Sequence, residues 1–520
     1  MDQVARGKRF TFKTVVLYKC IDIMASQAPN SPQPPAAGAR RLIARNFVSL
    51  SIGQVVVLVI GFVTSIYSRR VLGATAIGEV AWSASVLSYF TLVINPGLDT
   101  IAQRDVAREP GRANEYTSKM LSLRILLAIV SFCLVGLFAL LRLRGPQISL
   151  LLVLQGIGLL LVPLNLSWLL LARERMGAQV LANAVFLLLQ LPALFLLVHG
   201  PADVVRYVLY PYPFLIAAAC VVFWYAARHE LVDWRQLRIT LQGTWPLIRE
   251  AVPLGLSQMA ILLYFNSDAI FLGFMQGDTV VGFYSTAYRL WSYATFPFST
   301  LSQTYFPSLA RAGGSPEAQR RISSEYARLL LWFGLPISAV CWALGRYIVR
   351  LLYGNQFAES GPLFEWLSLN VALSSFTWGI TYPLSAWGHQ KKTLWITMLG
   401  AVSNVGLNFL VIPRFGAPGA VATTLLAELV ALVAGVVIRR KICPLPWVQL
   451  SWKPVLTSVI AAALVRWMVV VAPAYWWLAL VVGIAVCAVC LGLSERRILS
   501  TLIERIKARW RGNPGLGDDE

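Results

Sequence analysis

Two charged residues stand inside long apolar stretches of this sequence. Asp268 lies in YFNSDAIFLG beside Asn266 and Ser267, and Arg289 lies in STAYRLW on the next apolar stretch. An ionisable group at membrane depth is costly, so it usually faces a cavity or a partner and marks a functional site. With a turn near Gly277, the two residues differ in depth by about 5 Å. We expect Arg289 to bind an anion and Asp268 to be a protonatable group or its counter-ion; a purely structural ion pair is the alternative.

Other polar residues interrupt the apolar stretches with different chemistry. Glu428, in ATTLLAELVAL, can take up a proton or bond to Asn404 or Asn408 on the preceding stretch. Carboxylates and amides suit coupling of transport to H+ or Na+, and hydrogen bonding between helices is the structural alternative. Glu79 starts a stretch, where water or a helix N-terminus stabilises its charge. Arg466 is expected to face lipid headgroups or a partner.

Motifs of soluble catalysis are missing from the sequence. It contains no G-x-x-x-x-G-K-[ST], no H-E-x-x-H and no G-x-S-x-G pattern. The three histidines are far apart, and the C-x-x-C pair Cys487 and Cys490 lies in an apolar stretch, where cysteine acts as a small hydrophobe. We therefore expect no enzyme activity, no metal centre and no cofactor, and a process driven by an ion gradient or by the substrate.

The composition is that of a membrane protein. Of 520 residues, 57% are hydrophobic and 13% charged, against about a quarter charged in a soluble domain. A membrane-spanning helix needs about 20 apolar residues. The apolar stretches predict an all-α polytopic protein with fourteen such helices, at 46–67, 77–96, 121–141, 147–171, 178–198, 205–227, 250–274, 280–302, 329–352, 362–387, 394–412, 418–438, 454–471 and 475–494.

The distribution of basic residues supports this count. The formal net charge is +21, but the charges fall between apolar stretches rather than in one patch, which argues against nucleic acid as a partner. Thirty-five Lys and Arg residues lie on one side of the predicted membrane and eight on the other. Because cytoplasmic loops carry the excess of Lys and Arg, both termini are expected in the cytoplasm.

An internal repeat relates the two halves of the chain. Residues 48–91 align without a gap on residues 252–295, an offset of 204, with eleven identities in 44 positions. Six predicted helices separate the two copies, so both enter the membrane in the same direction. Parallel repeats of this kind form two bundles around a central cavity. Equivalent polar residues are candidates for lining it, with hydrogen bonding between helices as the alternative: Gln54 and Gln258, and Tyr89 and Tyr293.

These features predict the organisation of the whole chain. Two six-helix lobes are followed by two further helices. We expect a disordered basic cytoplasmic arm, with Met24 as an alternative translation start to Met1, then the lobes, a basic cytoplasmic linker and a cytoplasmic tail. The boundaries are 1–41 for the arm, 42–227 for the N-lobe, 228–249 for the linker, 250–438 for the C-lobe, 439–495 for the last two helices and 496–520 for the tail.

Three stretches resemble the polysaccharide transporter family, the Wzx-type flippases of the multidrug/oligosaccharidyl-lipid/polysaccharide (MOP) exporter superfamily, whose fold is MATE-like. The first covers residues 385–430, the second the hairpin from RRVLGATAIGEV onward, and the third residues 268–288. The residues that carry the resemblance are Gly388, Gln390, Lys391, Asn404, Asn408, Pro413, Gly416, Gly419 and Glu428; Leu72, Gly73, Gly78 and Gly97; and Asp268, Gly282, Tyr284 and Ala287.

The resemblance implies a flippase of the bacterial inner membrane. Its substrate would be an undecaprenyl-pyrophosphate-linked oligosaccharide, moved by alternating access for the biosynthesis of O-antigen, capsule or exopolysaccharide. A polysaccharide polymerase and assembly proteins would be its partners. The anionic pyrophosphate would contact Arg289, with Arg104, Arg124 and Lys391 at the inner mouth. A MATE-type multidrug or cation antiporter is the alternative, and it would favour a cavity of net negative character.

Overall fold

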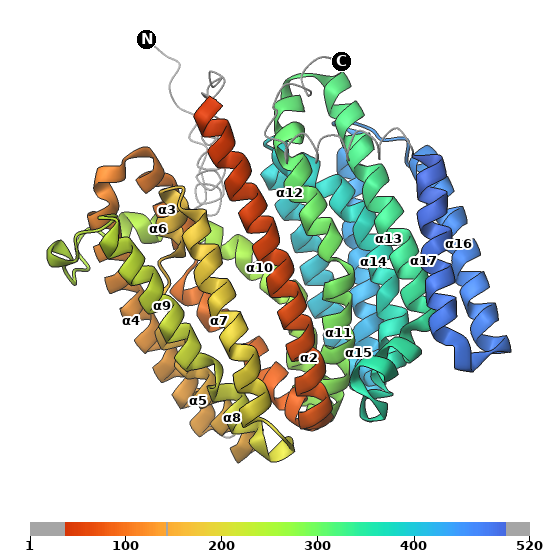
Figure 1. Cartoon of the computed structure of the whole chain (residues 1–520), viewed down its shortest axis with the longest axis horizontal. Helices are drawn as coiled ribbons and strands as arrows, with labels where there is room; N and C mark the ends of the chain where they lie inside the picture. The colour runs from red at the N-terminus through yellow and green to blue at the C-terminus, as the bar shows by residue number, and fades with distance from the viewer. Residues whose placement is uncertain (1–36, 142–143, 496–520) are drawn as a thin grey trace, which may run out of the picture.

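A computed structural model describes residues 37–141 and 144–495, without the side chains of 37–55, 176–182 and 184. These residues form helices and turns with no β-strand, as predicted. Figure 1 shows the helices: α2 (Ala37–Ile94), α3 (Leu98–Arg108), α4 (Ala113–Leu140), α5 (Pro146–Leu161), α6 (Ser167–Ala172), α7 (Met176–Leu197), α8 (Val204–Leu209), α9 (Pro211–Arg228), α10 (Trp245–Met275), α11 (Asp278–Ala294), α12 (Phe296–Arg311), α13 (Pro316–Tyr353), α14 (Ser360–Ala386), α15 (Gln390–Arg440), α16 (Trp447–Val471) and α17 (Trp476–Ser494).

Several predicted helices are continuous with their neighbours. Nine helical segments of the described chain are long and apolar enough to cross a membrane, and the count of fourteen stays a prediction. Two of the longest helices each contain two of the predicted stretches, joined at a glycine with non-helical backbone: α2 at Gly73 (φ 79°) and α15 at Gly416 (φ 57°). A residue with a side chain rarely adopts positive φ, so glycine is required where the chain reverses.

Some elements differ from the sequence-based expectation. The short helix α3 was not predicted, because only one face of it is apolar and it carries several charges. The predicted helix 147–171 is interrupted between α5 and α6, where Pro163 cannot donate a backbone hydrogen bond. Helix α13 begins at Pro316 rather than 329, with Ser315 as its N-cap. The arm was predicted to reach residue 41, but α2 begins at Ala37; the rest of that arm, like the tail 496–520, lies outside the described residues.

The helices form two groups, visible at left and right in Figure 1. Helices α3 to α9 lie on one side and α11 to α15 on the other, with α2 and α10 running between them. The last pair, α16 and α17, packs against α13 at the outer edge of the second group. We call the end of the bundle that holds Gly73 and Gly277 the turn end, and the opposite end, where α2 begins and α17 ends, the terminal end.

The two halves meet at the turn end through equivalent residues of the repeat. Gly78 of α2 crosses Gly282 of α11, its partner at the offset of 204, and a Cβ on Gly78 would lie 1.7 Å from the carbonyl oxygen of Asp278. The Thr75 and Thr279 hydroxyls, also equivalent, are 2.9 Å apart. Residues that contact their own equivalents lie on the axis that relates the two copies. The repeat is therefore a structural pseudo-two-fold, and its axis passes through this glycine crossing.

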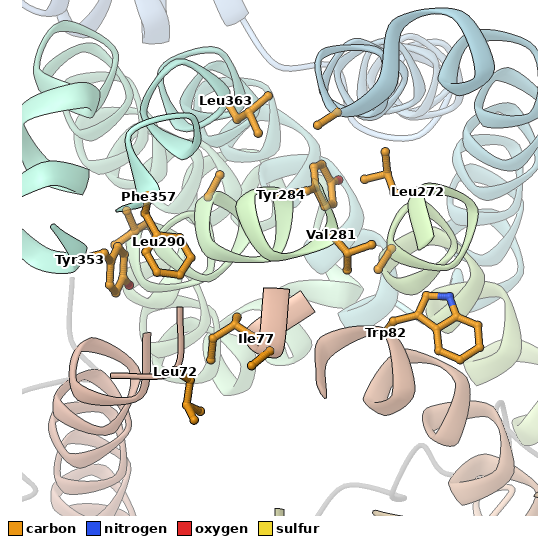
Figure 2. Packing of buried hydrophobic residues seen from close by; sticks show 14 of the residues in the cluster. Leu72, Ile77, Trp82, Leu272, Val281, Tyr284, Leu290, Tyr353, Phe357 and Leu363 are labelled. Atoms are coloured by element: carbon orange, nitrogen blue, oxygen red, sulfur yellow. The ribbon is translucent and has the colours of Figure 1, made fainter. Parts of the chain in front are cut away.

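Close packing surrounds the glycine crossing. Figure 2 shows part of the cluster, with Ile77 and Trp82 of α2 near Val281 of α11 and Leu272 of α10. Trp82 is 1% exposed, and it fits there because a side chain on Gly273 would lie 2.1 Å from its ring. Lipid tails are as apolar as these residues, so van der Waals packing and hydrogen bonds, rather than removal from water, hold such helices together.

Polar contacts reinforce the closure of the turn end. Arg144 forms an ion pair of 2.6 Å with Asp278 across the two halves, and its guanidinium lies 4.4 Å from the centre of the Trp82 ring. The Gln356 side chain donates to the carbonyl of Arg70 at 2.8 Å. Glu79 differs from expectation: it is buried and accepts a hydrogen bond from the Gln147 side chain, because the packed turn end excludes the water expected around it.

A methyl group at the glycine crossing should open it. In Gly282→Ala the new Cβ would lie 1.9 Å from the carbonyl oxygen of Ala74, so the two helices must separate. We expect a loss of at least about 2 kcal/mol in stability, read as a lower thermal midpoint of the purified protein. Disulfide formation in a Thr75→Cys/Thr279→Cys background should fall in parallel.

Gly136→Ala is the matched control, because nothing lies within 4 Å of a Cβ at this position in α4. It should be neutral or slightly stabilising. Equal effects of the two substitutions would show that the crossing is not closely packed.

Candidate functional site

A cavity of about 920 Å³ lies between α10 and the N-lobe helices α2, α3, α5 and α7 to α9. Its wall includes the non-helical backbone between α2 and α3, an arrangement tolerated inside a membrane protein only where it is buried or lines a cavity. Polar and aromatic side chains alternate with small apolar ones along the wall. The polar and aromatic members are Thr64, Ser88, Thr91, Asn95, Asp99, Thr100, Gln155, Gln190, Tyr207, Tyr210, Tyr212 and Gln258.

Two arginines from opposite halves, Arg69 and Arg289, lie in the same region of the bundle. The Arg69 guanidinium donates to Thr286 Oγ1 at 2.9 Å and to Ser65 Oγ at 2.8 Å, and lies over the Tyr353 ring. Arg289 follows Thr286 by three residues on α11, is exposed, and is within electrostatic range of Arg69. Neither arginine forms an ion pair with a described carboxylate, although Arg69 is only 7% exposed. Among the described residues, these two like charges therefore have no acidic counter-ion.

The sequence argument missed Arg69. It follows the first apolar stretch directly, in SRRVLG, and its position suggested a loop beyond the membrane. In the structure its neighbour Arg70 does behave as a loop residue, exposed and bonded to the carbonyl of Leu352. Arg69, one residue earlier on the helix, points into the bundle instead. Only the direction of the side chain separates the two, and a run of two arginines does not reveal it.

Asp268 lies in a fully buried polar cluster of the C-lobe, on α10. Its carboxylate accepts hydrogen bonds from the Tyr284 hydroxyl, from the Asn408 amide and, at 2.9 Å, from Thr424 Oγ1. Asn404 joins the cluster through Asn408 at 3.0 Å, and its Nδ2 has no partner. The expected pairing of Asp268 with Arg289 is not formed; the Asp268 carboxylate bonds instead to Tyr284 on α11 and to Asn408 and Thr424 on α15.

The hydrogen-bond partner of Glu428 also differs from the expected one. It accepts a hydrogen bond from the Tyr264 hydroxyl at 2.5 Å and is 6% exposed. The expected bond to Asn404 or Asn408 is not formed, since those amides are directed toward α10 and bond to Ser267 and Asp268. The C-lobe thus holds two buried carboxyl groups without a cationic partner among the described residues.

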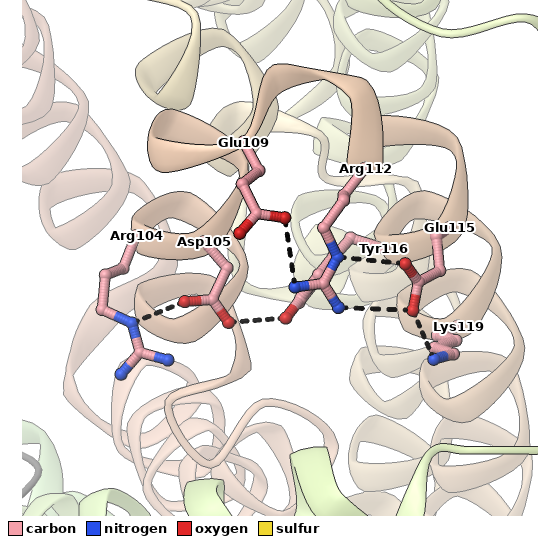
Figure 3. A network of polar contacts seen from close by, with 7 residues as sticks. All are labelled: Arg104, Asp105, Glu109, Arg112, Glu115, Tyr116 and Lys119. Carbon is pink, nitrogen blue, oxygen red and sulfur yellow. Dashed lines mark hydrogen bonds and ion pairs between the residues drawn. The ribbon is translucent and has the colours of Figure 1, made fainter.

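Two of the three basic residues expected at the inner mouth, Arg104 and Arg124, are held by acidic ones. Arg104 pairs with Asp105 and, across to α10, with Glu250, at 2.7 and 2.6 Å. Figure 3 shows how the network continues from Asp105 to Tyr116, and how Arg112 and Lys119 share Glu115. Arg124 is 1% exposed and pairs with Asp99 at 2.5 Å. Glu250 and Asp99, which are distant in sequence from Arg104 and Arg124, therefore compensate two cations that the sequence argument treated as free to bind a substrate.

The other candidates fall in different places. Gln258 is exposed and lines the cavity, and Tyr293 is half-buried with its ring 5.2 Å from that of Phe62. Tyr89 donates to the carbonyl of Leu262. Lys391 lies at the start of α15, whereas Gln54 lies outside the residues whose side chains are described. Arg466 is exposed on α16, beside a separate apolar groove.

Two helical halves related by a pseudo-two-fold, a cavity between them and buried charges within them define a membrane transporter. The model of the polysaccharide biosynthesis protein family matches residues 43–312, just over half of the chain. The chain therefore belongs to that family, and the resemblance seen in the sequence is confirmed. A curated relative, described as a "Putative O-antigen transporter" of Shigella dysenteriae, is 24% identical over 384 residues, covering 72% of this chain and 93% of the relative.

Solved structures with the same fold come from the MOP superfamily. "Lipid II flippase MurJ, inward closed conformation" aligns with a TM-score of 0.72 at 13% identity, covering 86% of this chain and 99% of that one. An inward-facing multidrug resistance MATE transporter aligns with a TM-score of 0.60 at 15% identity, covering 76% and 98%. At these identities the likeness concerns the fold alone, which is the MATE-like fold predicted from the sequence.

Double-mutant cycles should separate the Asp268 cluster from the arginine pair. Asp268→Asn and Asn408→Ala remove groups that bond to each other, so we expect a coupling energy of about 0.5–3 kcal/mol in unfolding. Asp268→Asn and Arg289→Ala should be additive within about 0.5 kcal/mol. Unfolding by denaturing detergent measures both cycles. Strong coupling between Asp268 and Arg289 in the second cycle would instead support the ion pair between them that the sequence suggested.

Proposed function

We propose that the protein translocates an undecaprenyl-pyrophosphate-linked oligosaccharide repeat unit across the bacterial inner membrane. The observation that carries the proposal is the pair Arg69 and Arg289, two cations from opposite halves that have no carboxylate partner in the part of the chain that the structure describes. Burying an unpaired charge is costly unless a ligand compensates it. A pyrophosphate brings at least two negative charges and several acceptor oxygens, and guanidinium groups bind phosphate in two-point geometry. Membership of the polysaccharide biosynthesis protein family supports the same substrate class.

The direction of transport follows from the placement of charge and of contacts. The terminal end carries most of the loop Lys and Arg residues, so the positive-inside rule puts it in the cytoplasm. The turn end, which then faces the periplasm, is sealed by the glycine crossing and the Arg144–Asp278 pair. In this state the arginine pair lies just below a closed outer gate, ready to receive a substrate from the cytoplasmic leaflet. Alternating access requires that gate to open once the substrate is bound.

A MATE-type antiporter for cationic drugs fits the site less well. The acidic side chain that lines the cavity, Asp99, is already paired with Arg124. The Asp268 and Glu428 carboxyl groups are buried behind α11 and α10. A cationic drug would meet Arg69 and Arg289 without a compensating carboxylate, and like charges repel strongly in a poorly solvated site.

We also propose that the Asp268 cluster couples transport to an ion. A carboxylate at 1% exposure without a cationic partner requires a proton or a metal cation to compensate its charge. Oxygen atoms of Asp268, Asn404, Tyr284 and Thr424 are gathered there, and hard cations such as Na+ prefer oxygen ligands. Glu428 with Tyr264 is a second candidate for the proton. Transport driven by H+ and transport driven by Na+ are the two forms of this proposal.

The arginine pair is tested by complementation. In a bacterium that lacks its own O-antigen flippase, wild type should restore surface polysaccharide. Arg69→Ala and Arg289→Ala, at matched membrane abundance, should lower it at least about tenfold, since each removes a charge-assisted contact of about 1.5–3 kcal/mol. Arg466→Ala also removes an arginine from a membrane helix, but one outside the cavity, and should behave like wild type. Full activity of both cavity variants would refute the anion site.

Coupling is tested with gradients imposed on membrane vesicles. Asp268→Asn keeps the hydrogen-bonding shape but loses the charge, so transport should no longer respond to the driving ion. Binding of farnesyl pyrophosphate should stay within about twofold of wild type, because the cluster is separate from the arginine pair. Glu428→Gln is the matched variant: if it abolishes the response while Asp268→Asn retains it, the coupling role moves to Glu428.

A further inference from the structure

The cavity that adjoins the arginine pair has its own chemical character. Asp99 is the single charged residue of its described lining, and it faces no cation of that wall, since its partner Arg124 is 1% exposed behind it. The rest of the polar wall is amide, hydroxyl and phenol. A pyrophosphate has no reason to enter such a space. The wall instead suits a ligand that is neutral and rich in hydroxyl groups.

One side-chain amide of the wall has no partner among the described residues, and another is exposed. The Gln155 Nε2 group is buried without a hydrogen-bond partner, and Gln258 is exposed on the opposite wall. An unsatisfied buried donor is destabilising unless a ligand or water occupies the space beside it. Asp99 is fixed in place, because Arg124 and Asn95 donate to its two oxygens at 2.5 and 2.6 Å. It therefore presents positioned acceptors to hydroxyl donors.

Aromatic rings complete the wall. Tyr207 and Tyr210 lie with ring centres 5.8 Å apart, and the Tyr212 hydroxyl is bonded to the carbonyls of Leu154 and Gln155, which holds its ring against α5. A ring with an apolar face and a polar rim matches a sugar, which has both C–H and O–H surfaces. The volume of about 920 Å³ is near the upper limit of about 1,000 Å³ for small-molecule sites, which leaves room for more than one sugar ring.

The cavity lies close to Arg69, although neither arginine is one of its lining residues. Thr64 of the cavity wall immediately precedes Ser65, whose hydroxyl binds Arg69. Tyr207 lines the cavity and is within electrostatic range of Arg69. A molecule that carries a pyrophosphate joined to a short glycan can therefore occupy both places at once, with the glycan extending from the arginine pair toward the terminal end.

We infer that the N-lobe cavity is a separate subsite for the first sugars of the substrate and that it selects uncharged sugars over uronic acids. This inference rests on the proposed function, since it assumes the lipid-pyrophosphate carrier. A uronate carboxylate would lose water in a wall whose described residues offer it no free cation, because Arg124 is buried and already paired with Asp99. Sugars with hydroxyl or N-acetyl groups satisfy Gln155, Gln258 and Asp99 without that cost.

Binding to the full-length purified protein tests the division of the site. The probes are farnesyl pyrophosphate, the same lipid pyrophosphate carrying a neutral trisaccharide, and one carrying a trisaccharide that starts with a uronic acid. Wild type should bind the neutral conjugate at least about tenfold more tightly than farnesyl pyrophosphate, as expected for two or more added hydrogen bonds. The acidic conjugate should bind no more tightly than farnesyl pyrophosphate.

Substitutions in the cavity wall test whether the tighter binding of the neutral conjugate comes from contacts in the cavity. Gln155→Leu and Gln258→Leu should remove most of the advantage of the neutral conjugate and leave farnesyl pyrophosphate within about twofold. Neither should impair folding, because Gln155 Nε2 has no partner and Gln258 is exposed. Gln449→Leu, the same change at an exposed residue of α16 outside the cavity, should change nothing. Arg289→Ala should weaken both ligands equally.

The outcomes separate this inference from the proposed function. If wild type fails to bind farnesyl pyrophosphate and either conjugate, the proposed function is overturned. If farnesyl pyrophosphate binds but the neutral trisaccharide adds nothing, or the glutamine variants keep the full gain, the glycan subsite is overturned and the proposed function stands. Equal binding of the acidic and neutral conjugates overturns the selection against uronic acids.

Discussion

The tightest helix contact among the described glycines is the crossing of α2 and α11 at Gly78 and Gly282. No side chain fits between the two helices there, because a Cβ on either glycine would overlap a backbone carbonyl of the other helix. The crossing brings equivalent parts of the two halves together on their common axis, and it sets the angle at which the halves diverge. Arg69 lies beside Thr286 in the same region, since it precedes the reversal at Gly73 by four residues and Thr286 follows Gly282 by one turn of α11. The proposed anion site therefore depends on an approach that these two glycines permit.

Charge compensation explains why the basic residues differ in role. Arg104, Arg124, Arg144 and Arg346 each have a carboxylate partner, and in a membrane protein such pairs hold helices in place. Arg69 and Arg289 have none among the described residues. In the C-lobe the imbalance is reversed, with Asp268 and Glu428 bonded only to neutral groups. In the proposal, the substrate anion compensates the two arginines, and the coupling ion compensates a buried carboxylate of the C-lobe.

Much of the fold was predictable from the sequence because the bilayer imposes simple rules. Apolar stretches of about 20 residues mark helices, and the alternation of basic loops orders them. The repeat offset was visible in the equivalent pairs Gly73/Gly277 and Gly78/Gly282. The first pair has positive φ and the second lies at a helix crossing, and glycine is required in both situations. Asp268 and Arg289 were visible because ionisable groups are rare at membrane depth. Helix α3 was not, because a short helix with one apolar face has no such signature.

The sequence alone therefore determined where most of the long helices lie, how the two halves correspond, and that Asp268, Arg289 and Glu428 stand within apolar stretches; each depends on a local cost that residue type reveals. The tertiary structure decided which charges are paired. Arg69 and Arg70 are neighbours in sequence, yet Arg69 points into the bundle and bonds to Thr286, whereas Arg70 is exposed and bonds to the carbonyl of Leu352. Asp268 bonds to α11 and α15, and Asp99 compensates Arg124 across 25 positions. Pairing depends on side-chain direction and on contacts between distant helices, and neither is encoded in any single stretch of the chain.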